Sequence, residues 1–199
     1  MSIVKFFNRW EAEGVKVNDL GLQGYITLQP RIMPKTGARY AGNRFHKSYT
    51  FIVERLATKL MVSGHKGKKH FMSSGHNTGK KDKALTVVER ALAKCEQQLK
   101  ENPLKILVAA IENAAPREEV IAIEYGGARY PKAVDVAPQR RIDLALRYMV
   151  QGAYVKSFNK KKKIEDSLSE EIIAAYKLSQ NSNAVSKKRD LERQAASSK

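Results

Sequence analysis

Apolar residues recur at steps of three and four over two early stretches of the chain, 52–61 and 85–99. This spacing predicts two amphipathic helices whose apolar faces point into a core. Cys95 lies on the apolar stripe of the second helix, so its thiol is expected to be buried rather than reactive. The stretch between these helices, 64–83, breaks the pattern with glycines and serines.

A third helix is expected to begin just after Asn102. The Asn102 side chain is a good N-cap, and Pro103 suits the first helical position because its missing N–H is not needed there. The apolar stripe continues over almost the whole circumference until Pro116 ends the helix. This helix is therefore predicted to be central and the most deeply buried.

The period then changes over 118–136, a stretch rich in Val, Ile and Tyr around Gly126-Gly127. Strand-forming residues on both sides of a glycine pair predict a β-hairpin with a tight turn. A two-stranded ribbon has little stability of its own. It is therefore expected to lean on the helices or to project toward a partner.

Helical spacing returns at Pro138 and again from Ile164, and a short basic helix is expected over 184–196. The predicted fold class is mainly α: about six helices with a β-hairpin inserted between the third and the fourth. Arg140, Arg141 and Arg147 are expected at or near the exposed face of the fourth helix.

The first 45 residues lack helical periodicity. Short strands are expected in the stretch 15–28, around its two glycines. The stretch 29–47 is rich in proline, glycine and basic residues, which indicates an extended arm that lies on a nucleic acid. Two parts are thus predicted, an N-terminal arm over 1–47 and a single helical domain over 48–199.

Charge changes the picture most. The 199 residues include 37 Lys and Arg against 20 Asp and Glu, a net charge of +17. A surplus of this size is the electrostatic footprint of a polyanion binder. Residues 101–150 are neutral, and the surplus falls on the segments that flank them.

Composition also bears on where the chain works. With Cys95 as its one cysteine, the chain has no internal disulfide, which suits a reducing compartment. No apolar run approaches the length that a membrane span requires, and the first residues are too charged for a secretory signal. A soluble, cytoplasmic protein is expected.

The stretch 64–83, "GHKGKKHFMSSGHNTGKKDK", is the strongest candidate for binding chemistry. Its histidines are surrounded by lysines and have no cysteine or carboxylate at zinc-ligand spacing, so no metal is expected. "GHNTGKK" lacks the spacing of a phosphate-binding nucleotide loop. Two interpretations remain: a clamp in which glycines and lysines receive a phosphate backbone, or a mobile solvated loop.

Longer segments resemble a known family: "LGLQGYITL", "GARYAGNRFHK", "HNTGKKDKA", "ENPLKILVAAIENAAPRE" and "GGARYPKAVDVAPQRRIDLAL", in this order along nearly the whole chain. The chain resembles small-subunit ribosomal protein seven in its archaeal and eukaryotic form. The lysine-rich "SFNKKKKIEDSL" departs from the family pattern.

The resemblance implies a structural role in the small ribosomal subunit, with no enzymatic activity, cofactor or membrane contact. It implies binding to the 3′ major (head) domain of the small-subunit rRNA, nucleation of head assembly, and contact with neighbouring ribosomal proteins. Together with the charge pattern it gives these candidate rRNA-binding residues: Arg31, Lys35, Arg39, Arg44, Lys66, Lys68, Lys69, His76, Asn77, Gly79, Lys80, Lys81, Lys83, Arg117, Arg140, Arg141, Arg147, Lys160, Lys161, Lys187, Lys188 and Arg189.

The resemblance further implies that the hairpin tip lies near the exit-site tRNA and the messenger RNA. Its candidate residues are Tyr125, Gly126, Gly127, Arg129 and Tyr130. The main alternative is a non-ribosomal, nucleoid-type protein, which would share the charge but prefer duplex DNA. An enzyme acting on RNA would need a pocket with perturbed titratable groups, and no sequence motif points to one.

Overall fold

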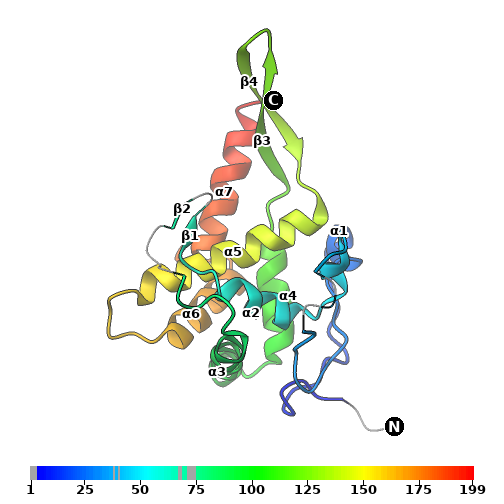
Figure 1. Cartoon of the computed structure of the whole chain (residues 1–199), viewed down its shortest axis with the longest axis vertical. Helices are drawn as coiled ribbons and strands as arrows, with labels where there is room; N and C mark the ends of the chain where they lie inside the picture. The colour runs from blue at the N-terminus through cyan, green and yellow to red at the C-terminus, as the bar shows by residue number, and fades with distance from the viewer. Residues whose placement is uncertain (1–3, 38, 40, 67–68, 71–74) are drawn as a thin grey trace.

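The computed structural model describes residues 4–199 except 38, 40, 67–68 and 71–74 (Figure 1). The predicted fold class is confirmed: the chain is mainly helical, with a two-stranded antiparallel hairpin between α4 and α5. Along the chain the elements are α1 (Leu20–Gln23), the 3₁₀ helix η1 (His46–Tyr49), α2 (Ile52–Leu60), β1 (His65–Lys66), β2 (Lys69–His70), α3 (Lys81–Leu99), α4 (Pro103–Ala114), β3 (Glu118–Tyr125), β4 (Ala128–Asp135), α5 (Pro138–Ser157), α6 (Ile164–Tyr176) and α7 (Asn183–Ala196).

Seven of the nine residues of α2 are buried, a larger share than in α4, so the prediction that α4 is the most deeply buried helix is wrong. Helix α4 nevertheless lies in the core, with eight of its twelve residues buried. Asn102 caps it by accepting a hydrogen bond from the backbone N–H of Leu104 at 2.9 Å, and Pro103 stands in its first turn. The helix contacts α3, α5, α6 and α7. Its side chains are buried on most of its circumference, which explains why its sequence is apolar almost throughout.

The apolar stripes predicted for α2 and α3 face this core. Leu56 and Leu92 are fully buried, and so is Cys95. Burial raises the pKa of the Cys95 thiol to about 12, which keeps it protonated and unreactive. The prediction of a buried core cysteine is confirmed.

Helices α5, α6 and α7 meet around a buried carboxylate. Glu171 accepts hydrogen bonds from the Ser182 hydroxyl at 2.8 Å, from the Ala184 backbone N–H at 3.1 Å and from the Lys156 ammonium at 2.7 Å. A side chain at Gly152 would approach Asn183 Cβ to 2.7 Å. The absent side chain thus lets α5 come close enough for these bonds to form.

The N-terminal segment is packed over part of its length, whereas the sequence indicated an extended arm. Phe6 is fully buried and its ring lies 5.5 Å from the ring of Phe51. The Trp10 indole N–H donates to Glu96 on α3 at 2.9 Å. The expected strands of 15–28 are also not found: residues 20–23 form helix α1, and Thr27 makes only an isolated bridge.

The hairpin β3–β4 projects from one end of the helical body, and α7 runs alongside its foot (Figure 1). The register pairs Glu118 with Asp135 and Tyr125 with Ala128. Gly126 and Gly127 both have positive φ, 56° and 84°, as a tight hairpin turn requires. No residue of either strand is fully buried. The hairpin thus rests on the body at its foot and is free at its tip.

Candidate nucleic-acid interface

The 64–83 stretch has two described parts. Its first part forms a small hairpin, β1–β2, in which His65 pairs with His70. Lys68 lies outside the described residues, and the side chains of Lys66 and Lys69 are likewise not described. The second part is a turn over 75–80 that leads into α3. Its glycines have positive φ, and its polar side chains His76, Asn77 and Lys80 are exposed.

The lysines at the junction of this turn and α3 differ in their partners. Lys81 forms an ion pair with Glu54, a fully buried carboxylate on α2. Glu54 also accepts hydrogen bonds from the backbone N–H and the hydroxyl of Thr36, at 2.9 and 2.8 Å. Lys81 therefore joins α3, α2 and the arm. Lys80 and Lys83 are exposed, and neither has an ion pair within the described part of the chain.

The arm contributes a cationic hollow of about 730 Å³ beside the start of α3. Lys35 reaches Asp82 at 2.8 Å and so links the hollow to the helix. Tyr49 is 75% exposed, and its ring lies edge-on to the ring of His46, at 5.7 Å between centroids. The residues that line the hollow are Arg31, Lys35, Thr36, Gly37, Arg39, His46, Tyr49 and Thr50.

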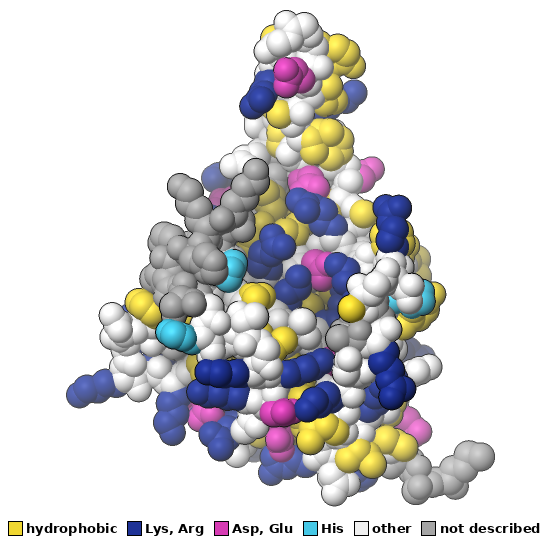
Figure 2. Space-filling view, viewed as in Figure 1, with side chains coloured by type: hydrophobic (Ala, Val, Ile, Leu, Met, Phe, Trp, Pro, Cys, Tyr) yellow, Lys and Arg dark blue, Asp and Glu magenta, His cyan; other side chains and the backbone are white. Residues whose placement is uncertain are grey.

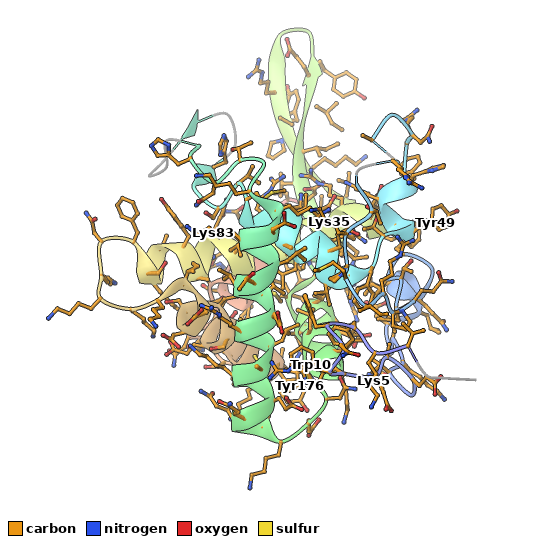
Figure 3. The ribbon with its side chains drawn as sticks, turned by 60° about the horizontal axis from the view of Figure 1, so that its bottom comes forward. Lys5, Trp10, Lys35, Tyr49, Lys83 and Tyr176 are labelled. Atoms are coloured by element: carbon orange, nitrogen blue, oxygen red, sulfur yellow. The ribbon has the colours of Figure 1, made fainter. Side chains whose placement is uncertain are left out.

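The hollow and the turn form one surface, which we call the arm–α3 face and define as residues 29–49 and 75–83. Lys35, Tyr49 and Lys83 lie in one row across Figure 3, away from Trp10 and Tyr176 at the other end of α3. The face carries eight Lys and Arg residues against the single acid Asp82, a net charge of +7. Arg44, on this face, stacks over Phe45 at 5.4 Å.

The basic residues at the start of α5 differ in exposure. Arg141 is buried: it donates to the Pro116 carbonyl at 3.2 Å and pairs with Asp19 at 2.6 Å. The expectation that it lies near the exposed face is wrong, because a carboxylate from the arm draws it inward. Arg140 is exposed and forms a fork with Glu119, at 2.7–3.0 Å. Arg147 is exposed.

An acidic residue on α5 forms ion pairs with basic side chains from the arm and from α2. Asp143 pairs with Lys47 of the arm, with Arg55 at 3.4 Å and with Lys59 at 3.7 Å. Burial alone would raise the pKa of Asp143, but the Lys47 hydrogen bond and the nearby cations outweigh it and hold the pKa below its usual range. This cluster attaches the arm to α5.

Of the basic residues near the other helix ends, some are exposed and others contact a carbonyl or a carboxylate. Lys160 and Lys161 are exposed in the turn before α6. On α7, Lys188 donates to the Asn113 carbonyl at 3.0 Å, and burial lowers its pKa. The remaining candidates near α7 are exposed Arg117 and Arg189, and Lys187, which lies 3.7 Å from Asp190.

The hairpin tip presents aromatic side chains rather than free cations. Tyr125 is 70% exposed and Tyr130 is 57% exposed. Arg129 is exposed and lies 3.4 Å from Glu124. Over residues 118–135 there are two basic and four acidic residues, a net charge of −2. The tip is thus better suited to stacking than to phosphate binding.

Figure 2 shows Lys and Arg side chains spread over the face on which α2 and α5 lie. Among the described residues, no group of three or more His, Cys, Asp or Glu side chains is arranged to hold a metal ion. None of the described helices is both long enough and apolar enough to cross a membrane.

The sequence interpretation missed the aromatic residues of this surface. Tyr49 and His46 line the hollow, and Tyr154 and Phe158 line a second cleft beside Lys80 and Lys83. An available signal was the adjacency of aromatic and basic residues, as in "RFHKSY" and "SFNKKKK". Aromatic faces next to cations are the usual elements of a single-stranded nucleic-acid site.

Comparison with known proteins agrees with these features. The family model described as ribosomal protein S7p/S5e matches residues 22–199. The small ribosomal subunit protein uS7 of Nanoarchaeum equitans is 52% identical over 196 residues, which is 98% of this chain and 99% of that protein. The uS7 protein of Methanothrix thermoacetophila is 45% identical over 192 residues, or 96% and 98% of the two chains. On this evidence the chain belongs to the ribosomal protein S7p/S5e family.

Proposed function

We propose that this chain is a structural protein of the small ribosomal subunit and binds its rRNA mainly through the arm–α3 face. The observation that carries the proposal is the net charge of +7 on that face, where Lys80 and Lys83 are exposed and make no ion pair with the described residues. Phosphates that replace counterions on such a surface supply a large part of the binding free energy. The relatives named above are small-subunit proteins, which supports the ribosomal setting.

The resemblance refines the proposal. The bound RNA is the 3′ major domain, and the protein acts early in assembly of the subunit head, beside other ribosomal proteins. Arg31 and Arg39 on the arm–α3 face, and Lys160 and Lys161 in the turn before α6, contact phosphates, since they are exposed and have no ion pair in the described part of the chain. Lys81 and Arg141 have structural roles instead, because their charges are held by Glu54 and Asp19.

The hairpin tip has a separate role in the proposal. Tyr125 and Tyr130 stack on unpaired bases of the exit-site tRNA or the messenger RNA near the tip. Their high exposure supports this, and so does the distance of the tip from the helical body (Figure 1). The chain needs no cofactor and carries out no catalysis in this role.

The test is the salt dependence of RNA binding. The full-length protein is titrated against a transcript of the 3′ major domain of Nanoarchaeum equitans small-subunit rRNA, between roughly 50 and 200 mM salt. Roughly five to eight phosphate contacts give a log–log slope of about −4 to −7. A nearly flat dependence would refute the phosphate-dominated mode. Tighter binding to duplex DNA of equal length would instead favour a nucleoid-type protein.

A further inference from the structure

A second hollow adjoins the arm–α3 face and differs from it in chemistry. This cleft, of about 380 Å³, opens where the end of α2, the start of α3 and the end of α5 meet. Its floor is apolar and consists of Leu60, Met61, Ala84 and Val87. A phosphate would lose hydration on such a floor without gaining partners, so the cleft is unsuited to an anion itself.

One wall of the cleft is aromatic. Tyr154 and Phe158 are one helical turn apart on α5, with ring centroids 5.4 Å apart and planes tilted by 42°. Phe158 is the C-cap of α5, and its backbone N–H donates to the Tyr154 carbonyl at 2.8 Å. This bond fixes the backbone that carries the Phe158 ring. Phe158 is 39% exposed, an apolar residue left open to water beside lysines.

The rim of the cleft is cationic and polar. Lys80 and Lys83 stand on the α3 side, exposed and without an ion pair in the described part of the chain. Asn77 and Asn159 add exposed amides, which both donate and accept hydrogen bonds. Lys162, on the α6 side, is held by Glu170. An apolar floor, an aromatic wall, amides and free cations are thus brought together from four parts of the chain.

We propose that this cleft receives one unpaired nucleobase from an RNA strand whose phosphates lie on Lys80 and Lys83. The base stacks on Phe158, and the Asn77 and Asn159 amides reach its polar edge. The cationic rim favours this occupant, because a base always comes with anionic phosphates on either side, whereas an apolar side chain of another protein brings no such charge. The inference rests on the proposed function and adds a base-binding site to it.

The experiment compares two strands of equal length and charge. One is a single-stranded RNA of about 12 nucleotides and mixed sequence, and the other is an abasic strand with the same phosphates. The wild-type protein should bind the base-bearing strand about 5- to 100-fold more tightly. Phe158→Ala should remove most of that ratio while leaving affinity for the abasic strand unchanged, and Phe158→Trp should retain the ratio.

Two control variants complete the design. Val155→Ala truncates another exposed apolar residue of α5, outside the cleft, and should leave the ratio unchanged. Lys80→Ala with Lys83→Ala should weaken binding of both strands. Thermal melting checks that each variant is folded.

The outcomes separate the two proposals. If no strand binds even at low salt, the proposed RNA binding itself fails. If both strands bind equally to the wild type, or if Phe158→Ala keeps the full ratio, the base-binding site is refuted and RNA binding through phosphates stands. In that case the cleft is left for an apolar side chain of a neighbouring protein.

Discussion

The arm and the hairpin both extend from the helical body, yet they are built in opposite ways. The arm has little regular structure but is fastened by buried rings: Phe6 is inaccessible and Trp10 is 6% exposed. The hairpin has a regular eight-residue register, and no side chain of its two strands is fully buried. The irregular arm is therefore more firmly packed into the core than the regularly hydrogen-bonded hairpin.

The two regions also differ in net charge. The arm–α3 face carries a net charge of +7, whereas residues 118–135 carry −2. On the face, Lys80 and Lys83 are exposed and make no ion pair with any residue that the structure describes. On the hairpin, Arg129 is beside Glu124, and at its foot Glu119 holds Arg140. From this comparison we expect a basic residue to contribute to polyanion binding only where its local partners leave its charge uncompensated.

The largest expected effect tests the fastening of the arm. Phe6→Ala should lower the free energy of unfolding by about 3–5 kcal/mol, because it leaves a cavity against Phe51. Ile121→Ala, on the exposed part of the hairpin, should change it by less than about 0.5 kcal/mol. Urea denaturation measures both. Equal losses would contradict the distinction between a packed arm and an unpacked hairpin.

The next effect separates two adjacent lysines. Lys81→Ala should lower the free energy of unfolding by roughly 3 kcal/mol, because it leaves the buried Glu54 carboxylate without its cation. Lys80→Ala is the matched control and should leave stability nearly unchanged. Urea unfolding of the two variants side by side gives the answer. Similar stability for both would mean that the Glu54 pair contributes nothing to folding.

A smaller effect concerns RNA affinity. Lys80→Ala with Lys83→Ala should weaken binding to the rRNA transcript by roughly tenfold at low salt and reduce the salt slope by about 1.4–1.8. Arg129→Ala with Lys132→Ala removes as much charge from the hairpin and should leave the slope unchanged. Filter binding over a salt series checks both pairs. An equal change in the salt slope for both double variants would contradict the proposed difference between the arm–α3 face and the hairpin.

A pH series tests the attachment of the arm to α5. The folded-state pKa of Asp143 is depressed, so its contribution to stability is present above the unfolded pKa of about 3.9 and is lost as pH falls through the folded value. Asp143→Asn should therefore be less stable than wild type at neutral pH, with the gap closing below about pH 4. Urea unfolding at a series of pH values measures this gap. A gap independent of pH would show that the carboxylate charge is not what holds Lys47.

The smallest effect on stability belongs to the hairpin tip. Replacing Tyr125–Tyr130 by a two-residue turn should change the free energy of unfolding by less than about 1 kcal/mol and leave rRNA affinity intact, since all six residues of the tip are exposed. Such a protein should still enter small subunits but handle exit-site tRNA or reading frame poorly. Loss of folding or of rRNA binding would place the tip in the core.

The sequence was sufficient for the parts whose apolar residues follow one period. The stripes of α2 and α3, the cap at Asn102 and the turn at Gly126-Gly127 are local signals, and the structure confirms them. The packed arm has no such period. Phe6 and Trp10 come together because Phe7 and Asn8 adopt positive φ, 51° and 55°, which neither a helical nor a strand pattern anticipates.

The sequence predicted which segments of the candidate site are basic, but not which of their residues have buried partners. A count of lysines and arginines located the basic segments, but it did not distinguish Lys81 from Lys80. The partner of Lys81 is 27 residues earlier, and the partner of Arg141 is 122 residues earlier. The cleft at Phe158 consists of the ends of separate helices. Such pairings depend on tertiary packing, which periodicity does not report.

The long reach of the arm also sets an order of events during synthesis. The Trp10 indole can bind Glu96 only after 86 further residues have been made, and the Glu11 carbonyl can bind Asn102 only after 91 further residues. At about 5–20 residues per second, these partners are made roughly 4–18 s after the arm. Until then the Trp10 indole N–H has no partner on α3. The first part of this chain to leave the translating ribosome therefore takes its folded position only after roughly half of the chain has been made.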